Sequence, residues 1–338
     1  MQDLEGAFAR AEGPFGPKTL FYRLSVPEDM ETNPYHVVLG TGPLGLAVVR
    51  ALGGRDESVR VVNRSGEASV PGEIDCVAAD MSRVEDARRA CDGASVVYFC
   101  VQPPYGQWPE LFPTLLENAI AGAERADARL VVAENCYMYG PVDGPLTEDL
   151  PYDAVGRKGR TRAAMSRTAL QAHENGQLEV AIGRASDFYG PHVTVSIVGE
   201  RVFASALAEK PAYVLGDPDT LHTYTFIDDF GQALVKLGDR PEAAGEAWHV
   251  PSAETMTTRR FVELVYERAG TSPRIRRMPS WMFRAVSTVS RELRELRETS
   301  YQFEEPFVVD HSKFKAAFGA DTTSHETAID RTLDWYRS

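Results

Sequence analysis

The chain has 338 residues, of which 43% are hydrophobic and 25% charged, and its formal net charge is −13. A chain of this length can bury a full core in one large unit and still supply a smaller second lobe. The acidic excess argues against nucleic acid and anionic lipid as partners, and no apolar run approaches the roughly 20 residues that span a bilayer. We therefore expect a globular protein that binds a small molecule, as a monomer or a homodimer.

The cysteines and the first residues indicate a compartment. Cys76, Cys91, Cys100 and Cys136 show no CxxC spacing, and three of them lie in or beside apolar, strand-like runs. Buried reduced thiols fit this pattern better than disulfides or a metal site. The first residues lack the charged segment and continuous apolar stretch of a secretory signal. We expect a cytoplasmic protein with no bound metal.

Short β-branched runs alternate with helical patterns from residue 35 onward, whereas residues 1–32 show no clear strand pattern and are interpreted as an N-terminal extension. Strands are expected at residues 35–39, 58–62, 76–78, 95–101, 130–133, 179–183, 224–227 and 247–250. Helices are expected at residues 44–52, 84–91, 111–126 and 158–173, the last capped at Gly176. This alternation predicts an α/β fold, a doubly wound parallel sheet of the Rossmann type.

The alternation loosens after about residue 186, which indicates a second lobe. Helix starts are predicted there by N-cap signals at Thr258 and Ser280. We interpret residues 33–185 as the dinucleotide-binding domain and residues 186–338 as mainly a substrate-binding lobe, with residues 222–250 returning to the core. The charged run at residues 291–298 is expected to be a solvated helix face.

A glycine-rich loop lies between the first predicted strand and the first predicted helix. The first glycine permits a tight turn, the second leaves room for a pyrophosphate, and the third lets the helix pack close to the strand. The free N–H groups of the helix start then face the phosphates. The loop therefore predicts a dinucleotide site made by Gly40, Thr41, Gly42, Pro43, Leu44 and Gly45.

The end of the second predicted strand indicates which dinucleotide is bound. Its residues are Asn63, Arg64 and Ser65, with no carboxylate to hold a ribose 2′-hydroxyl. Arg64 can pair with a 2′-phosphate, and its neighbours can add hydrogen bonds, so NADP(H) is the expected cofactor. After the next strand, Asp80 and Met81 are expected beside the adenine, although Asp80 could instead cap the helix that follows.

The chain resembles the extended or atypical short-chain dehydrogenases/reductases of the NAD-dependent epimerase/dehydratase type. The resemblance covers roughly residues 35–338 and rests on the glycine loop and on four further segments, which are Tyr137–Gly140, Gly183–Pro191, Tyr224–Asp229 and Leu333–Trp335. It implies hydride chemistry, or the modification of sugars and other small molecules, without choosing among them.

The resemblance also implies a catalytic set: a Ser or Thr after the fifth strand, then a Tyr and, four residues on, a Lys that binds the ribose. These positions hold Asn135, Lys158 and Arg162, so the catalytic tyrosine is missing. Arg162 can bind the ribose but is not a proton source. Lys158 is expected to act as acid or base through a pKa lowered by burial and by Arg162, unless it is a surface lysine.

Three tyrosines are candidates to replace the missing one: Tyr105, Tyr137 and Tyr152. Tyr137 is favoured because it follows Asn135 at the carboxyl end of the sheet, where ligands bind. Tyr139 and Tyr189 are expected to be structural, and His192 and His222 are either catalytic or solvated loop residues. The remaining predicted cofactor-binding residues are Gln102, Lys158, Ser186 and Asp187.

Three functions are compatible with this pattern. The first is an NADP(H)-dependent oxidoreductase or epimerase acting on a small metabolite. The second is a non-redox lyase, isomerase or cyclase that uses Lys158, Tyr137 or Asn135. The third is a catalytically silent sensor of the NADPH/NADP⁺ ratio.

Overall fold

The structure is a computed structural model that describes residues 35–338 apart from 54, 56, 71–73, 279–282, 284–287 and 289–293. The extension predicted at residues 1–32 and the helix start predicted at Ser280 lie outside the described residues. Among the residues that are described, no helix is both long and apolar enough to cross a membrane.

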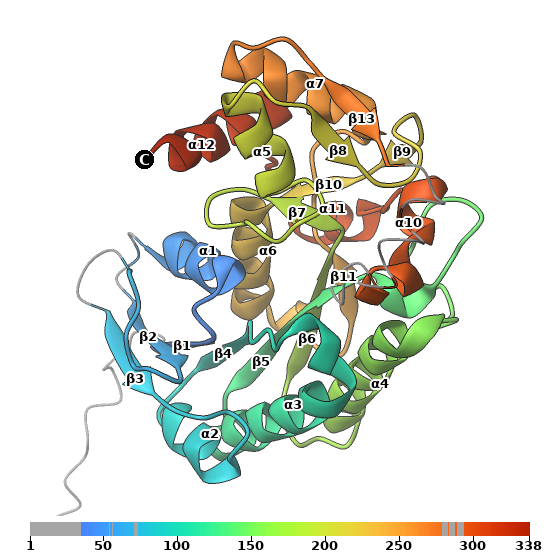
Figure 1. Ribbon diagram of the computed structural model, residues 1–338. Coiled ribbons are helices and arrows are strands. Elements are labelled where there is room, and N and C mark those ends of the chain that lie inside the picture. The colour runs from blue at the N-terminus through green and yellow to red at the C-terminus, as the bar shows by residue number, and fades with distance from the viewer. Residues whose placement is uncertain are drawn as a thin grey trace, which may run out of the picture. The chain divides into compact units, whose positions relative to one another are not determined.

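A seven-stranded parallel sheet forms the centre of the fold, in the order β11-β6-β5-β4-β1-β2-β3 (Figure 1). Its strands are β1 (Tyr35–Leu39), β2 (Ser58–Asn63), β3 (Asp75–Ala78), β4 (Val96–Phe99), β5 (Arg129–Asn135), β6 (Val180–Ala185) and β11 (Ala247–His249). The chain order reverses between β1 and β4, which is the switch point where ligands bind in such sheets. The predicted doubly wound Rossmann-type fold is confirmed.

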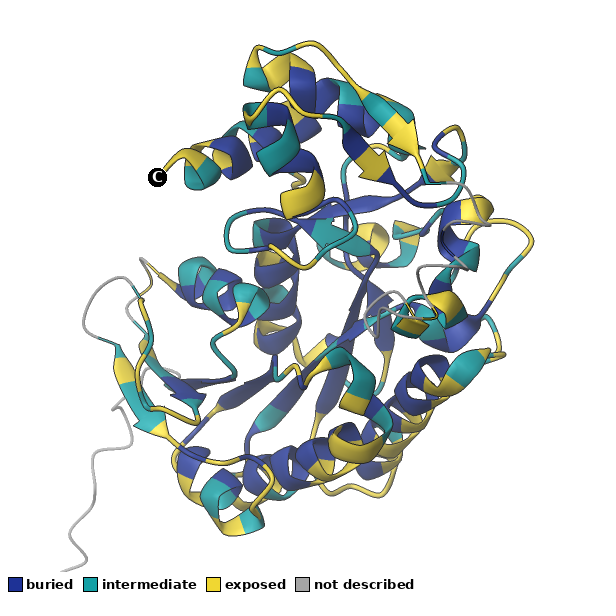
Figure 2. Cartoon of the chain, in the orientation of Figure 1, coloured by how far each residue is buried: buried dark blue, intermediate teal, exposed yellow. Residues whose placement is uncertain are grey.

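Helices cover both faces of the sheet, so its central strands are buried (Figure 2). Val37 and Leu39 of β1 belong to the core on one face, while Val38 between them belongs to the core on the other. The first face is covered by α2 (Val84–Ala90), α3 (Trp108–Arg125) and α4 (Gly156–Glu174). The second is covered by α1 (Pro43–Leu52) and α6 (Ile227–Asp239).

Most of the remaining elements are short and belong to the second half of the chain. Three two-stranded pairs, β10–β7, β12–β9 and β13–β8, accompany helices around a third apolar core. These elements are η1 (Tyr105–Gln107), η2 (Tyr137–Tyr139), β7 (Asp187–Tyr189), α5 (Glu200–Leu207), β8 (Ala212–Val214), β9 (Leu221–His222), β10 (Tyr224–Phe226), η3 (Pro241–Ala243), β12 (Met256–Thr257), α7 (Thr258–Ala269), β13 (Ile275–Arg277), η4 (Arg297–Thr299), α10 (Tyr301–Glu304), α11 (Ser312–Phe318) and α12 (His325–Arg337).

Two local predictions differ from the structure. The strand predicted at residues 224–227 pairs with β7 outside the large sheet, and the chain returns to that sheet only with β11. Helix α7 is capped by Thr257, whose hydroxyl accepts the Arg260 N–H at 3.1 Å, rather than by Thr258. Both threonines carry the same cap signal, so the sequence did not distinguish them.

Candidate functional site

The glycine loop connects β1 to α1 at the carboxyl end of the sheet. Gly40 has φ +102°, which favours glycine, and a Cβ on Gly45 would lie 1.9 Å from the Gly40 carbonyl oxygen. A Cβ on Gly42 would meet nothing within 4 Å, so the space beside this exposed glycine is open. The N-terminal N–H groups of α1 have no partner within the helix. The open space and the free N–H groups together fit a pyrophosphate.

Asn63 connects the glycine loop to the turn after β2. Its amide nitrogen donates to the Thr41 hydroxyl at 2.8 Å and to the Glu67 carbonyl at 2.7 Å. Its amide oxygen accepts from the Ser65 and Gly66 N–H groups. Asn63 therefore holds the predicted 2′-phosphate turn in place, and both of its amide hydrogens are already used.

Arg64 is exposed in this turn and makes no hydrogen bond or ion pair with any residue that the structure describes. Asp80 is also exposed, and hydrogen bonds from Ser82 lower the pKa of its carboxyl, with a smaller contribution from the charge of Arg64. Asp80 does not cap α2, because Arg83 occupies the cap position. Met81 is only 5% exposed and packs into the core, rather than standing free for an adenine ring.

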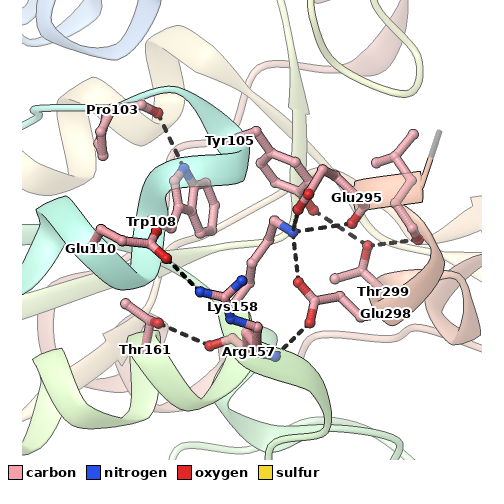
Figure 3. A network of polar contacts seen from close by, with 11 residues as sticks. Pro103, Tyr105, Trp108, Glu110, Arg157, Lys158, Thr161, Glu295, Glu298 and Thr299 are labelled. Carbon is pink, nitrogen blue, oxygen red and sulfur yellow. Dashed lines mark hydrogen bonds and ion pairs between the residues drawn. The ribbon is translucent and has the colours of Figure 1, made fainter. Parts of the chain in front are cut away.

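Lys158 lies in the first turn of α4 with its side chain only 3% exposed. Its ammonium donates to Glu295 and, at 2.6 Å, to Glu298, and lies 4.4 Å from the centre of the Tyr105 ring (Figure 3). Burial alone would lower the pKa of Lys158, but the hydrogen bonds to the two carboxylates outweigh it and raise this pKa. The predictions of a lowered pKa and of a surface lysine are therefore both wrong.

Glu295 and Glu298 contact Lys158, and the sequence pattern did not indicate these contacts. Both belong to the charged run at residues 291–298, of which residues 291–293 lie outside the described part. Glu298 also accepts the Arg157 backbone N–H at 2.5 Å. The interpretation of this run as a solvated helix face is wrong for these two side chains, which reach Lys158 across 137 and 140 residues of sequence.

Arg162 lies one helical turn after Lys158 and is 4% exposed. Its guanidinium stacks over the rings of Trp108 and Phe112, 4.5 and 4.2 Å from their centres, and donates to Gln102 at 3.4 Å. Burial lowers the pKa of Arg162 to about 10. Its Nε and Nη1 atoms are buried without a hydrogen-bond partner in the described residues. Such orphaned donors are costly, so they fit oxygen atoms that a ligand would bring.

Two tyrosines adjoin this helix. Asn135, at the end of β5, accepts the Tyr137 backbone N–H at 3.2 Å, and the Tyr137 ring stacks on Trp108. The Tyr105 hydroxyl lies 3.4 Å from the Thr299 hydroxyl and interacts with that of Tyr137. Burial raises the pKa of both phenols, and that of Tyr137 rises well above its usual value.

The third tyrosine candidate, Tyr152, is half-buried, and the expected structural tyrosines Tyr139 and Tyr189 are buried. Tyr152 and Tyr139 both accept hydrogen bonds from the buried Arg184, and Tyr139 also bonds to His249. Tyr189 packs against Phe261, with 4.9 Å between ring centres. Tyr152 is therefore part of a buried polar network rather than a free phenol.

Ser186 and Asp187 follow β6 directly. The Ser186 hydroxyl is buried and donates to the Thr223 carbonyl at 2.5 Å. Asp187 lies 3.0 Å from His222 Nε2. His222 is 1% exposed and is therefore not a solvated loop histidine, whereas His192 packs against Trp335. The Asp187–His222 contact joins residues 35 apart in sequence, and no motif indicated it.

The structure thus collects Tyr105, Tyr137, Lys158, Arg162 and Asp187 around the carboxyl ends of β4, β5 and β6. Tyr105 and Tyr137 both interact with the charge of Asp187. Lys158 contacts the Tyr105 ring, and Arg162 contacts the Trp108 ring. Within the described residues, no group of three or more His, Cys, Asp or Glu side chains is arranged to hold a metal ion. The arrangement suits binding and proton transfer by side chains.

Comparison with known proteins gives a family and a fold. The sequence model of the NAD dependent epimerase/dehydratase family matches residues 37–250. The epimerase Mth375 from Methanothermobacter thermautotrophicus has a TM-score of 0.75 and 16% identity, covering 90% of this chain and 92% of that one. Comparison with curated proteins gives no match.

Two further solved structures have NAD bound. UDP-glucuronic acid 4-epimerase from Bacillus cereus has a TM-score of 0.73 and 16% identity, covering 90% of this chain and 96% of that one. The dTDP-glucose 4,6-dehydratase DesIV from Streptomyces venezuelae has a TM-score of 0.72 and 18% identity, covering 90% of this chain and 97% of that one. At these identities, the solved structures establish the shared fold.

Proposed function

Because the chain belongs to the NAD dependent epimerase/dehydratase family, we propose that it is an NADP(H)-dependent oxidoreductase or epimerase acting on a small polar metabolite. The sugar-nucleotide class is the first substrate class to test, because the solved structures of similar fold include a UDP-sugar epimerase and a dTDP-sugar dehydratase. The bound dinucleotide would supply or accept the hydride.

The observation that carries this proposal is the pair of orphaned donors on Arg162. This arginine stands one turn after Lys158, where the family has its ribose-binding lysine, and its Nε and Nη1 atoms are buried without partners in the described residues. The ribose of a nicotinamide nucleotide carries two adjacent hydroxyl groups that can accept from such donors. Gln102 already contacts the same guanidinium and stands beside this position.

The preference for NADP(H) rests on Arg64. Its exposed guanidinium has no partner among the described residues, and the strand end beside it carries Asn63 in place of a carboxylate. A free arginine can pair bidentately with a 2′-phosphate, whereas a carboxylate would repel it. Asn63 keeps this turn beside the glycine loop, which would hold the pyrophosphate.

Calorimetric titration of the full chain with NADPH and with NADH tests the cofactor. We expect NADPH to bind about 10–100 times more tightly, because a charge-assisted hydrogen bond contributes about 1.5–3 kcal/mol. Arg64→Ala should remove this preference and leave NADH binding unchanged. Arg125→Ala, an exposed arginine on α3, is the matched control. The proposal fails if neither nucleotide binds, or if R64A weakens both equally.

A non-redox reaction based on Lys158 is less well supported. Its ammonium is paired with two carboxylates, and these hydrogen bonds raise its pKa, so it is a poor base near neutral pH. Incubating the protein with UDP-glucuronate or dTDP-glucose, with and without NADP⁺, separates the two functions. Turnover that requires the nucleotide is expected, and turnover without any nucleotide, added or co-purified, would favour the non-redox alternative.

A further inference from the structure

The Asp187–His222 pair is a proton-holding group that the proposed function has not yet used. The carboxylate lies two residues beyond the end of β6, 3.0 Å from His222 Nε2. The Asp187 side chain is 17% exposed and that of His222 is 1% exposed. The histidine ring packs between the rings of Tyr224, Phe303 and Phe307. Asp187 is therefore the member of the pair that solvent can reach, and the imidazole of His222 is buried.

The two polar contacts of His222 can both be hydrogen bonds only if the pair holds an extra proton. Its Nδ1 atom lies 3.2 Å from the Gln302 carbonyl oxygen, which can only accept, so this contact is a hydrogen bond only when Nδ1 carries a hydrogen. Its Nε2 atom faces a carboxylate, which also only accepts when ionised. A hydrogen bond between Nε2 and Asp187 therefore needs one more proton, held on either the imidazole or the carboxyl.

Two other buried histidines do not show this arrangement. His249 Nδ1 faces the Asp310 carbonyl, and its Nε2 faces the Tyr139 hydroxyl at 2.8 Å. His325 likewise has one carbonyl partner and one tyrosine hydroxyl. A hydroxyl can donate to a bare ring nitrogen, so neutral imidazoles satisfy both of these sites. His222 differs because acceptors face both of its ring nitrogens.

The titratable groups around the Asp187–His222 pair are poorer proton donors than the pair itself. Among the described residues, the titratable side chains that interact with the charge of Asp187 include Tyr105, Cys136, Tyr137, Tyr224 and Tyr301. Burial is the largest cause of the raised pKa of each of them, and the Asp187 charge adds to it. All five remain protonated near neutral pH and give up a proton reluctantly.

We infer that Asp187 exchanges the substrate proton in place of the missing tyrosine, and that His222 is a positioning residue that shares this proton. The inference rests on the proposed function, because it assigns acid–base chemistry to the same site. In the reducing direction, the pair would give its extra proton to the substrate carbonyl oxygen, forming an O–H bond, while a bound NADPH would supply a hydride, with its two electrons, to the carbon. The products are an alcohol, NADP⁺, ionised Asp187 and neutral His222, which solvent reprotonates.

The location of the proton can be measured without nucleotide or substrate. Nitrogen-15 NMR of the full chain reports the protonation of both His222 nitrogens, and carbon-13 NMR reports the Asp187 carboxyl. At neutral pH we expect either a doubly protonated imidazole or a protonated carboxyl. Asp187→Asn should leave a neutral ring with a hydrogen on Nδ1 alone. An ionised Asp187 beside a neutral His222 in the unmodified chain would overturn the inference.

Kinetics of the variants test the catalytic role, using a substrate that the unmodified enzyme accepts. D187N should lower kcat by about 100-fold or more, the usual scale for loss of a general acid or base. His222→Gln should lower kcat less and shift its pH profile, while its affinity for NADPH stays unchanged. Tyr213→Phe, an exposed tyrosine, is the matched control. A D187N enzyme with full kcat, or a loss explained by weaker NADPH binding, would refute the role.

These two measurements separate this inference from the proposed function. If the unmodified chain does not bind NADPH, the proposed function fails. The NMR measurement still tests the protonation of the Asp187–His222 pair, because it needs no nucleotide. If NADPH binds and turnover occurs but D187N has no effect, only the inference fails.

Discussion

The Arg162 guanidinium lies over the indole ring of Trp108, 4.5 Å from its centre, and this contact replaces the carboxylate partner that a buried arginine usually has. An aromatic face attracts a cation, but by about 0.5–2 kcal/mol, which is less than the cost of burying an unpaired charge. The lowered pKa of Arg162, caused by burial, reflects the same imbalance. The fold therefore holds this arginine at a cost in stability.

Arg162→Met tests that cost. Methionine keeps much of the packing against Trp108 and Phe112 but removes the charge and the two orphaned donors. We expect the free energy of unfolding in urea to rise by about 1–3 kcal/mol, while the affinity for NADPH falls by about tenfold or more. A variant that is less stable and binds NADPH normally would contradict both the energetic argument and the ribose assignment.

Glu295 and Glu298 should stabilise the buried charge of Lys158. The double variant E295Q/E298Q leaves an ammonium with neutral partners, and we expect it to lower the free energy of unfolding by about 3–5 kcal/mol. Adding Lys158→Met removes the charge and should recover most of this loss. Urea unfolding of the unmodified chain, the double variant and the triple variant measures both effects.

The pair Arg157–Glu110 provides the control for that experiment. Its side chains are 64% and 55% exposed, so E110Q should change the free energy of unfolding by less than about 1 kcal/mol. If E295Q/E298Q has no larger effect than E110Q, the two carboxylates do not stabilise Lys158.

The parts of the site that the sequence predicts are those built from neighbouring residues. The glycine loop and the strand and helix beside it lie within residues 35–52, and the period of their apolar residues matches the observed β1 and α1. The spacing of Lys158 and Arg162 likewise places them one turn apart on α4 in the structure. Local spacing fixes local geometry, so these predictions needed no tertiary contact.

The chemistry of the site depends on contacts that spacing does not encode. The pKa of Lys158 changes direction because two carboxylates from the end of the chain reach it, and a charged run has the same sequence pattern whether it faces water or a buried lysine. Asp187 and His222 meet through the packing of β7, β9 and α10, which no periodicity reveals. Tertiary packing, rather than local pattern, decides which titratable groups are paired.

Stability should fall in acid because of His249. Burial lowers the pKa of this histidine to about 4, compared with about 6.5 in an unfolded chain. The unfolded state therefore binds a proton before the folded state does, so the contribution of His249 is complete above about pH 6.5 and is lost as the pH falls towards 4. Taken alone, this difference in pKa corresponds to a contribution of about 3 kcal/mol to the free energy of unfolding at neutral pH.

The free energy of unfolding, measured by urea denaturation between about pH 7 and pH 4, tests this contribution. The comparison is between the unmodified chain and His249→Gln, each relative to its own value at neutral pH. The variant should lose less stability over this range, because it has no imidazole to protonate beside Arg184. His173→Gln, at a half-buried histidine whose Nδ1 accepts the Val180 N–H at 3.4 Å, is the comparison variant. Parallel curves for H249Q and the unmodified chain would refute the assignment.

The glycine loop offers a pair of substitutions with opposite expected results. A Cβ at Gly42 would meet nothing, and the backbone there has φ −71°, so Gly42→Ala should change the free energy of unfolding by less than about 0.5 kcal/mol. The added methyl group would occupy the space assigned to the pyrophosphate and should weaken NADPH binding by about tenfold or more. A Cβ at Gly45 would overlap the Gly40 carbonyl, so Gly45→Ala should cost about 3 kcal/mol or more. Thermal unfolding and calorimetric titration of both variants measure these effects, and normal NADPH binding by a stable G42A chain would place the pyrophosphate elsewhere.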